Sequence, residues 1–83
     1  MKAKTKEWIF PHLEEKLWEA HISISEIAKL LGIARQAIYP KMRGEIDWKR
    51  LQMEIIKQEL EKRLKRNFTI DYLFKEESPN GNK

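Results

Sequence analysis

Apolar residues recur every three or four positions through most of the chain, a spacing that predicts amphipathic α-helices. We expect the first helix over 11–20, because Pro11 suits a first helical turn, in which its missing N–H costs nothing. Ser23 and Glu26 form a capping box, in which each side chain accepts a hydrogen bond from the backbone N–H of the other residue. This pair predicts the start of a second helix, which we expect to end at Leu31.

Glycines mark the limits of the next segment. Gly32 fits the position after a helix, where a left-handed backbone is cheapest without a Cβ, and Gly44 ends the following element in the same way. We therefore predict a third helix over 34–43. Asp47 is a good N-cap for a fourth and longest helix over 48–66. Three glycines and three prolines are too few turn signals for a β fold, so we expect an all-α fold.

The fourth predicted helix carries two apolar stripes, of which one can face a core while the other needs a second cover. The first stripe consists of Trp48, Leu51 and Ile55, and the second of Met53, Ile56, Leu60 and Leu64. The second stripe is our candidate surface for a dimer or a partner protein. The alternative is that it only covers a fifth helix.

Residues 68–74 fit two structures. Their apolar side chains alternate as in a strand, whereas Thr69 can cap a short helix, which we favour. The two ends of the chain are polar. We expect a basic arm over 1–8, one helical domain over 9–76 and a disordered polar tail over 77–83.

Composition narrows the classes of protein to which the chain can belong. Its 83 residues, 41% hydrophobic and 36% charged, suffice for one small domain. The lack of cysteine excludes disulfides, thiolate nucleophiles and cysteine-ligated zinc. Apolar runs no longer than the one at 8–10 exclude a membrane span, and we expect a cytoplasmic protein. The net charge of +4 favours a polyanionic partner only weakly.

The stretch over 23–43 combines two short predicted helices with a glycine turn between them. Ala28 is small enough for a close helix crossing, and Ile33 and Ile38 fit the inner face of the second helix. No acidic residue stands between Ile27 and Gly44. The outer face of the second helix carries Arg35, Gln36, Tyr39 and Arg43. Such side chains can reach guanine, adenine and phosphate in a major groove of DNA.

The segment Ser-Ile-Ser-Glu-Ile-Ala-Lys-Leu-Leu-Gly-Ile-Ala-Arg-Gln-Ala-Ile-Tyr over 23–39 resembles the helix-turn-helix of bacterial and phage regulators. Further matches flank it: Phe-Pro-His-Leu at 10–13, Lys-Met-Arg-Gly at 41–44 and Ile-Asp-Tyr-Leu-Phe at 70–74. Over about residues 9–76 the pattern is similar to the lambda-repressor-like (Xre/Cro-type) domains of temperate phages and mobile elements.

This resemblance implies a small five-helix bundle that contains a helix-turn-helix and usually binds two DNA half-sites as a homodimer. It implies base contacts by Arg35, Gln36 and Tyr39 and a backbone contact by Arg43. We expect further phosphate contacts by Ser25, Lys29 and Lys41. The function expected is that of a sequence-specific, repressor-like or Cro-like regulator in a bacterial host cell, with double-stranded DNA as its partner and without metal, cofactor or membrane.

Pro40 departs most from the family pattern, because a proline inside a helix removes a hydrogen bond and disfavours helical geometry at the residue before it. It predicts a recognition helix that is kinked or ends early. His21 stands where the family commonly has a glycine turn, and we expect a turn there.

Two other functions stay open on the sequence alone. One is a protein-interaction module that uses the apolar stripe of the helix over 48–66, and the other is a DNA packaging or recombination factor. Trp8, Trp18 and Trp48 are expected in the core, because each stands beside apolar residues at helical spacing. No phosphate-binding glycine loop, catalytic set or histidine ligand pattern is recognised, so we expect neither an enzyme nor a metal site.

Overall fold

The computed structural model describes residues 8–77, which form five α-helices and one 3-10 helix without a strand. The elements are α1 (Pro11–Glu19), α2 (Ile24–Leu31), η1 (Arg35–Ala37), α3 (Ile38–Met42), α4 (Arg50–Leu64) and α5 (Ile70–Leu73). The predicted all-α fold with five helices is therefore confirmed for this part of the chain. All of the predicted basic arm except residue 8, and all of the predicted tail except residue 77, lie outside the described residues.

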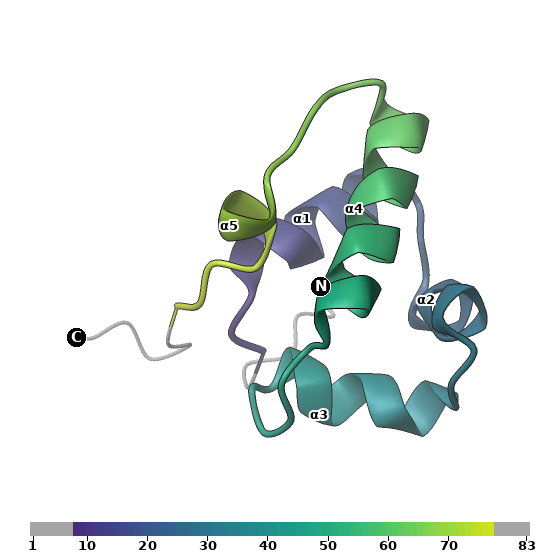
Figure 1. Ribbon diagram of the computed structural model, residues 1–83, viewed down its shortest axis with the longest axis vertical. Helices are drawn as coiled ribbons and strands as arrows, with labels where there is room; N and C mark the ends of the chain where they lie inside the picture. The colour runs from purple at the N-terminus through teal and green to yellow at the C-terminus, as the bar shows by residue number, and fades with distance from the viewer. Residues whose placement is uncertain (1–7, 78–83) are drawn as a thin grey trace.

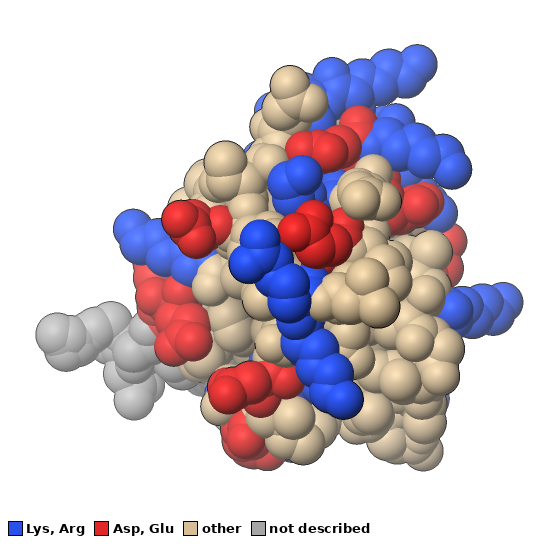
Figure 2. All heavy atoms as spheres, in the orientation of Figure 1, with Lys and Arg blue, Asp and Glu red and all other residues tan. Residues whose placement is uncertain are grey.

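The longest helix, α4, organises the arrangement. Figure 1 shows it upright in front of α1, with α2 and α5 on opposite sides and α3 below. α4 packs against α1, α2 and α5, and α2 packs against η1 and α3. In the same orientation, Figure 2 shows basic and acidic side chains interleaved over α4, while the surface over α3 is mainly uncharged.

The local signals for α1 and α2 form as predicted. Pro11 opens α1, and the chain then turns at His21, whose φ of 59° is left-handed. The Ser23 side chain accepts a hydrogen bond from the Glu26 N–H at 3.1 Å, and the Glu26 carboxylate accepts one from the Ser23 N–H at 3.0 Å. Gly32 ends α2 with a φ of 70°, a conformation that only glycine adopts without steric cost.

The predicted single helix over 34–43 is wrong, because the segment is divided into η1 and α3. The division explains how Pro40 is accommodated. Pro40 is the third residue of α3, and the first four N–H groups of an α-helix have no intrahelical acceptor. The proline therefore removes no hydrogen bond from α3, and the irregularity lies ahead of it, where the 3-10 turn meets the α-helix.

Both ends of α4 lie inside the predicted range over 48–66. The N-cap is Lys49 rather than Asp47, and the Gln52 side-chain oxygen accepts a hydrogen bond from the Lys49 N–H at 3.0 Å. Lys65, with a left-handed φ of 56°, ends the helix. The helical alternative for 68–74 is confirmed, and Thr69 caps α5 by accepting a hydrogen bond from the Tyr72 N–H at 3.0 Å.

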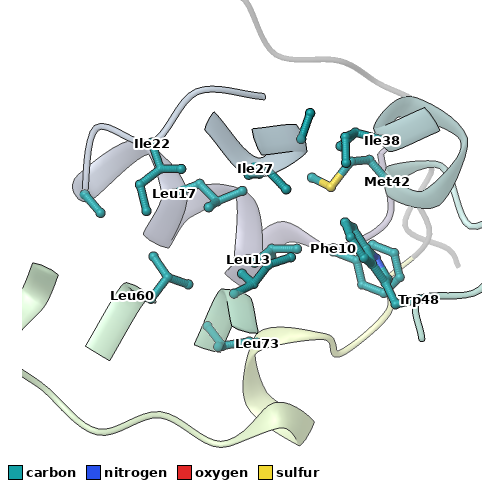
Figure 3. Packing of buried hydrophobic residues seen from close by; sticks show 13 residues of the cluster. Phe10, Leu13, Leu17, Ile22, Ile27, Ile38, Met42, Trp48, Leu60 and Leu73 are labelled. Carbon is teal, nitrogen blue, oxygen red and sulfur yellow. The ribbon is translucent and has the colours of Figure 1, made fainter. Parts of the chain in front are cut away.

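One hydrophobic core joins all five α-helices (Figure 3). Its fully buried side chains are Leu13 of α1, Ile27 of α2, Ile38 and Met42 of α3, Ile56 and Leu60 of α4 and Leu73 of α5. Burying one side chain of this size stabilises the fold by about 1.5–3 kcal/mol, so every helix is tied to the others through the core.

The prediction of three core tryptophans is only partly correct. Trp48 is buried, and Trp8 packs against the edge of the core. Trp18 is 79% exposed, so its predicted core position is wrong. Leu17 faces the core, and the next residue of a helix points about 100° away from it.

Candidate nucleic-acid interface

The turn between α2 and η1 sets the position of the predicted reading residues. The Ile33 N–H donates to the Ala28 carbonyl at 3.1 Å, and the Gly32 N–H donates to the Lys29 carbonyl at 3.3 Å. Shortly after the turn, Ile38 is completely buried beneath α2. The segment between Gly32 and Ile38 is therefore held at both ends.

Arg35 and Gln36 lie on this held segment and are both exposed. Neither side chain makes a hydrogen bond or an ion pair with another described residue. Successive side chains of a 3-10 helix diverge by about 120°, since it has three residues per turn. The two side chains are thus available to solvent and point in different directions.

Tyr39, the third predicted base-contacting residue, is half-buried. Its ring lies against Trp8, with 6.4 Å between the ring centroids and an angle of 41° between the planes. Tyr39 follows Arg35 by four positions in the chain, but part of its ring packs against Trp8.

Ser25 and Lys29 lie one turn apart on α2 and are both exposed. Residues four apart share one face of a helix, so the two can contact the same partner. Neither side chain is bonded to another described residue. The pKa of the neighbouring Glu26 is lowered, first by the hydrogen bond from the Ser23 N–H, then by Arg63, and least by the charge of Lys29.

The prediction that Lys41 contacts phosphate is wrong. Lys41 is only 6% exposed, and its Nζ donates a hydrogen bond to the Asp47 carbonyl at 3.1 Å. The same Nζ lies 5.8 Å from the centroid of the Trp48 ring, within the range of a cation–π interaction. Lys41 therefore holds the loop between α3 and α4 and is not available to a polyanion.

Arg43 is engaged inside the chain as well. Its Nε and Nη2 donate to the two carboxylate oxygens of Glu45 at 2.9 and 3.0 Å. These hydrogen bonds lower the pKa of Glu45. The fork thus pairs Arg43, the predicted backbone contact, with the first acidic residue after the stretch that ends at Gly44.

The prediction of a dimer or partner surface over Met53, Ile56, Leu60 and Leu64 is wrong. Ile56 and Leu60 are 1% and 0% exposed, and the other two pack against the same core. They lie on the face of α4 that covers α1, α2 and α5. The alternative, that the stripe only covers a fifth helix, is partly correct, because α4 packs against α5 but also against α1 and α2.

A network of hydrogen bonds around Arg63 was not predicted from the sequence. Its guanidinium donates to Glu59 at 2.8 Å and to Glu26 at 3.3 Å, and reaches the Ala20 carbonyl at 3.5 Å. These bonds raise the pKa of Arg63. They join the last turns of α4 to the capping box of α2, and so help to set the direction of the helix that carries Ser25 and Lys29. Of the three partners of Arg63, only Glu59 stands four positions away, a helical spacing that the sequence shows.

Other kinds of site find less support in the described residues. Over 8–77 no group of three or more histidine or acidic side chains is arranged to hold a metal ion. No helix in the same range is long and apolar enough to cross a membrane. Comparison with known protein families, with curated proteins and with solved structures finds no match to the chain.

Proposed function

We propose that the chain is a sequence-specific regulator of the lambda-repressor-like helix-turn-helix kind, which binds duplex DNA as a homodimer. The observation that carries the proposal is the pair Arg35 and Gln36, exposed and free of partners among the described residues, on a segment anchored by Gly32 and Ile38. Neither side chain has to break a hydrogen bond with a described residue on binding, and the backbone beneath it is already held. The main ordering cost is therefore the lost rotamer freedom of each side chain, about 0.5–1.5 kcal/mol.

The chemistry of the two side chains suits base recognition. An arginine can donate two hydrogen bonds to guanine O6 and N7, and a glutamine can pair with adenine N6 and N7. Because Arg35 and Gln36 diverge, they would read two different bases. Ser25 and Lys29, which α2 presents one turn apart, would contact the phosphates beside them.

Binding assays on a library of duplex fragments, repeated over a series of salt concentrations, test the proposal. Arg35→Ala should weaken binding to the preferred sequence by about 1–3 kcal/mol and relax the preference at one base pair. Lys29→Ala should weaken binding to all sequences alike and reduce the salt slope by about 0.9, the share of one phosphate.

Lys75→Ala is the matched control. It also removes one exposed positive charge, but it follows α5 in the chain, and α5 lies on the opposite side of α4 from α2 (Figure 1). It should change neither the preferred sequence nor the salt slope. The proposal is refuted if no duplex is bound at low salt, or if Arg35→Ala behaves like Lys75→Ala.

The alternative of a protein-interaction module cannot use the stripe of Met53, Ile56, Leu60 and Leu64, which the chain's own core occupies, and would depend on the face of α4 that carries the exposed Leu51. A packaging or recombination factor would use the same DNA contacts. Footprints that avoid promoters would favour that factor over a regulator.

A further inference from the structure

The other predicted apolar stripe is only partly covered: Trp48 is buried, whereas Leu51 and Ile55, its two members on α4, are not completely covered. Leu51 is 70% exposed, so no described element of the chain covers it. Ile55 is half-buried one turn further along the same face. Ile46, in the loop that leads into α4, is 51% exposed. Leu51, with the half-buried Ile55 beside it, leaves apolar surface of α4 in solvent, and an exposed apolar patch can mark a surface that meets a partner.

We propose that this face of α4 pairs with the same face of a second copy of the chain. The pairing would supply the dimer contact that the proposed function requires, and to that extent it rests on the proposed function. The charges that flank the apolar residues support this pairing.

The arrangement of charges on this face is self-complementary, so that two copies related by a twofold axis can pair opposite charges. Arg50 donates to Glu54 at 3.1 Å along α4, and the Arg50 side chain is 77% exposed. A twofold axis perpendicular to α4 near residues 52 and 53 makes the two helices antiparallel. It then places Leu51 opposite Ile55 of the second copy, and Arg50 of each copy within reach of Glu54 of the other. In this pairing the apolar Leu51 meets the apolar Ile55, and the positive Arg50 meets the negative Glu54.

The second exposed apolar site, Trp18, lacks this property. Glu15 is exposed one turn before Trp18 on the outer side of α1. A twofold pairing of that face would bring the Glu15 carboxylates of the two copies toward each other, which is unfavourable. The face around Leu51 is therefore the one that fits a second copy.

The small area of the face around Leu51 limits the expected affinity of the dimer. A stable specific complex usually buries about 800 Å² on each partner, and two aliphatic side chains with one ion pair supply only part of this area. We expect an equilibrium that depends on protein concentration rather than a permanent dimer.

Sedimentation equilibrium of the full chain without DNA tests the pairing. The average mass should rise from 10.0 kDa toward twice that value as the concentration increases. Leu51→Glu should raise the dissociation constant of the dimer at least about tenfold, which corresponds to 1.4 kcal/mol. Trp18→Ser removes an equally exposed apolar side chain from α1 and should leave the constant unchanged.

Exchange of the two charges tests whether Arg50 and Glu54 contribute to the pairing. Arg50→Glu alone and Glu54→Arg alone each place like charges opposite each other, so both should weaken the dimer. The double variant should restore the wild-type constant. A chain that stays at 10.0 kDa to millimolar concentration, or a dimer that is insensitive to Leu51→Glu, overturns the pairing. The sedimentation samples contain no DNA, so neither result bears on DNA binding. The assays with Arg35→Ala and Lys29→Ala decide that question separately.

Discussion

Replacement of Lys41 by methionine separates a structural lysine from a DNA-contacting one. The substitution keeps most of the aliphatic length of the side chain and removes only its charged end. In the structure that end donates to the Asp47 carbonyl and lies beside the Trp48 ring. The carbonyl would lose its donor in the loop between α3 and α4.

The size of the effect follows from these two contacts. A hydrogen bond from a charged group contributes about 1.5–3 kcal/mol, and a partly desolvated cation–π contact about 0.5–1 kcal/mol or more. Relief from burying the charge of a side chain that is only 6% exposed offsets part of this loss. We expect a net loss of about 1–2 kcal/mol in the free energy of unfolding. For a domain of this size, 1 kcal/mol lowers the midpoint of thermal unfolding by about 4–8 °C.

Thermal and urea unfolding, together with DNA binding over a series of salt concentrations, measure both properties. Lys41→Met should lower stability and leave the salt slope unchanged. Lys29→Met should show the opposite result, because Lys29 is exposed and makes no hydrogen bond or ion pair with another described side chain. If Lys41→Met reduced the salt slope by about 0.9 at unchanged stability, the assignment of Lys41 to the loop would be refuted.

Further predictions concern the two turn glycines and the capping box. Gly44→Ala should destabilise the fold more than Gly32→Ala: both residues have a positive φ, but a Cβ at Gly44 would overlap the Ile9 side chain, whereas the space at Gly32 is open. Equal losses in thermal unfolding would contradict this. The lowered pKa of Glu26 means that its carboxylate stabilises the fold above the ordinary value of 4.5, and that this stabilisation is lost as the pH falls through the lower folded value. Glu26→Gln should therefore flatten the decrease in unfolding midpoint between neutral and acid pH, and an unchanged slope would count against the hydrogen bond to the Ser23 N–H.

The elements that sequence analysis predicted correctly depend on residues close together in the chain. The capping box of α2, the left-handed Gly32 and the Thr69 cap of α5 each involve groups no more than five positions apart. Their hydrogen bonds form as soon as the local backbone is helical, so the same pattern produces the same structure in most surroundings.

Pro40 shows the limit of a local rule. Pro40 was expected to kink the helix or end it early, but α3 continues through Pro40 to Met42, and the irregularity is the 3-10 turn of η1 ahead of it. Where the chain breaks depends on how Ile38 and Met42 reach the core, and both are completely buried. Packing between elements therefore decides the position of the break.

By itself the sequence determined that the chain is helical, where α1 and α2 begin and end, and which short segment after Gly32 presents Arg35 and Gln36. Only the tertiary structure decided which side of each helix is covered. That decision placed Lys41 in the interior, exposed Trp18 and Leu51, and joined Arg63 to Glu26 across 37 positions of the chain. The physical reason is one of range: a cap or turn is stabilised by its immediate neighbours, whereas burial and ion pairing between helices depend on residues that only the completed fold brings together.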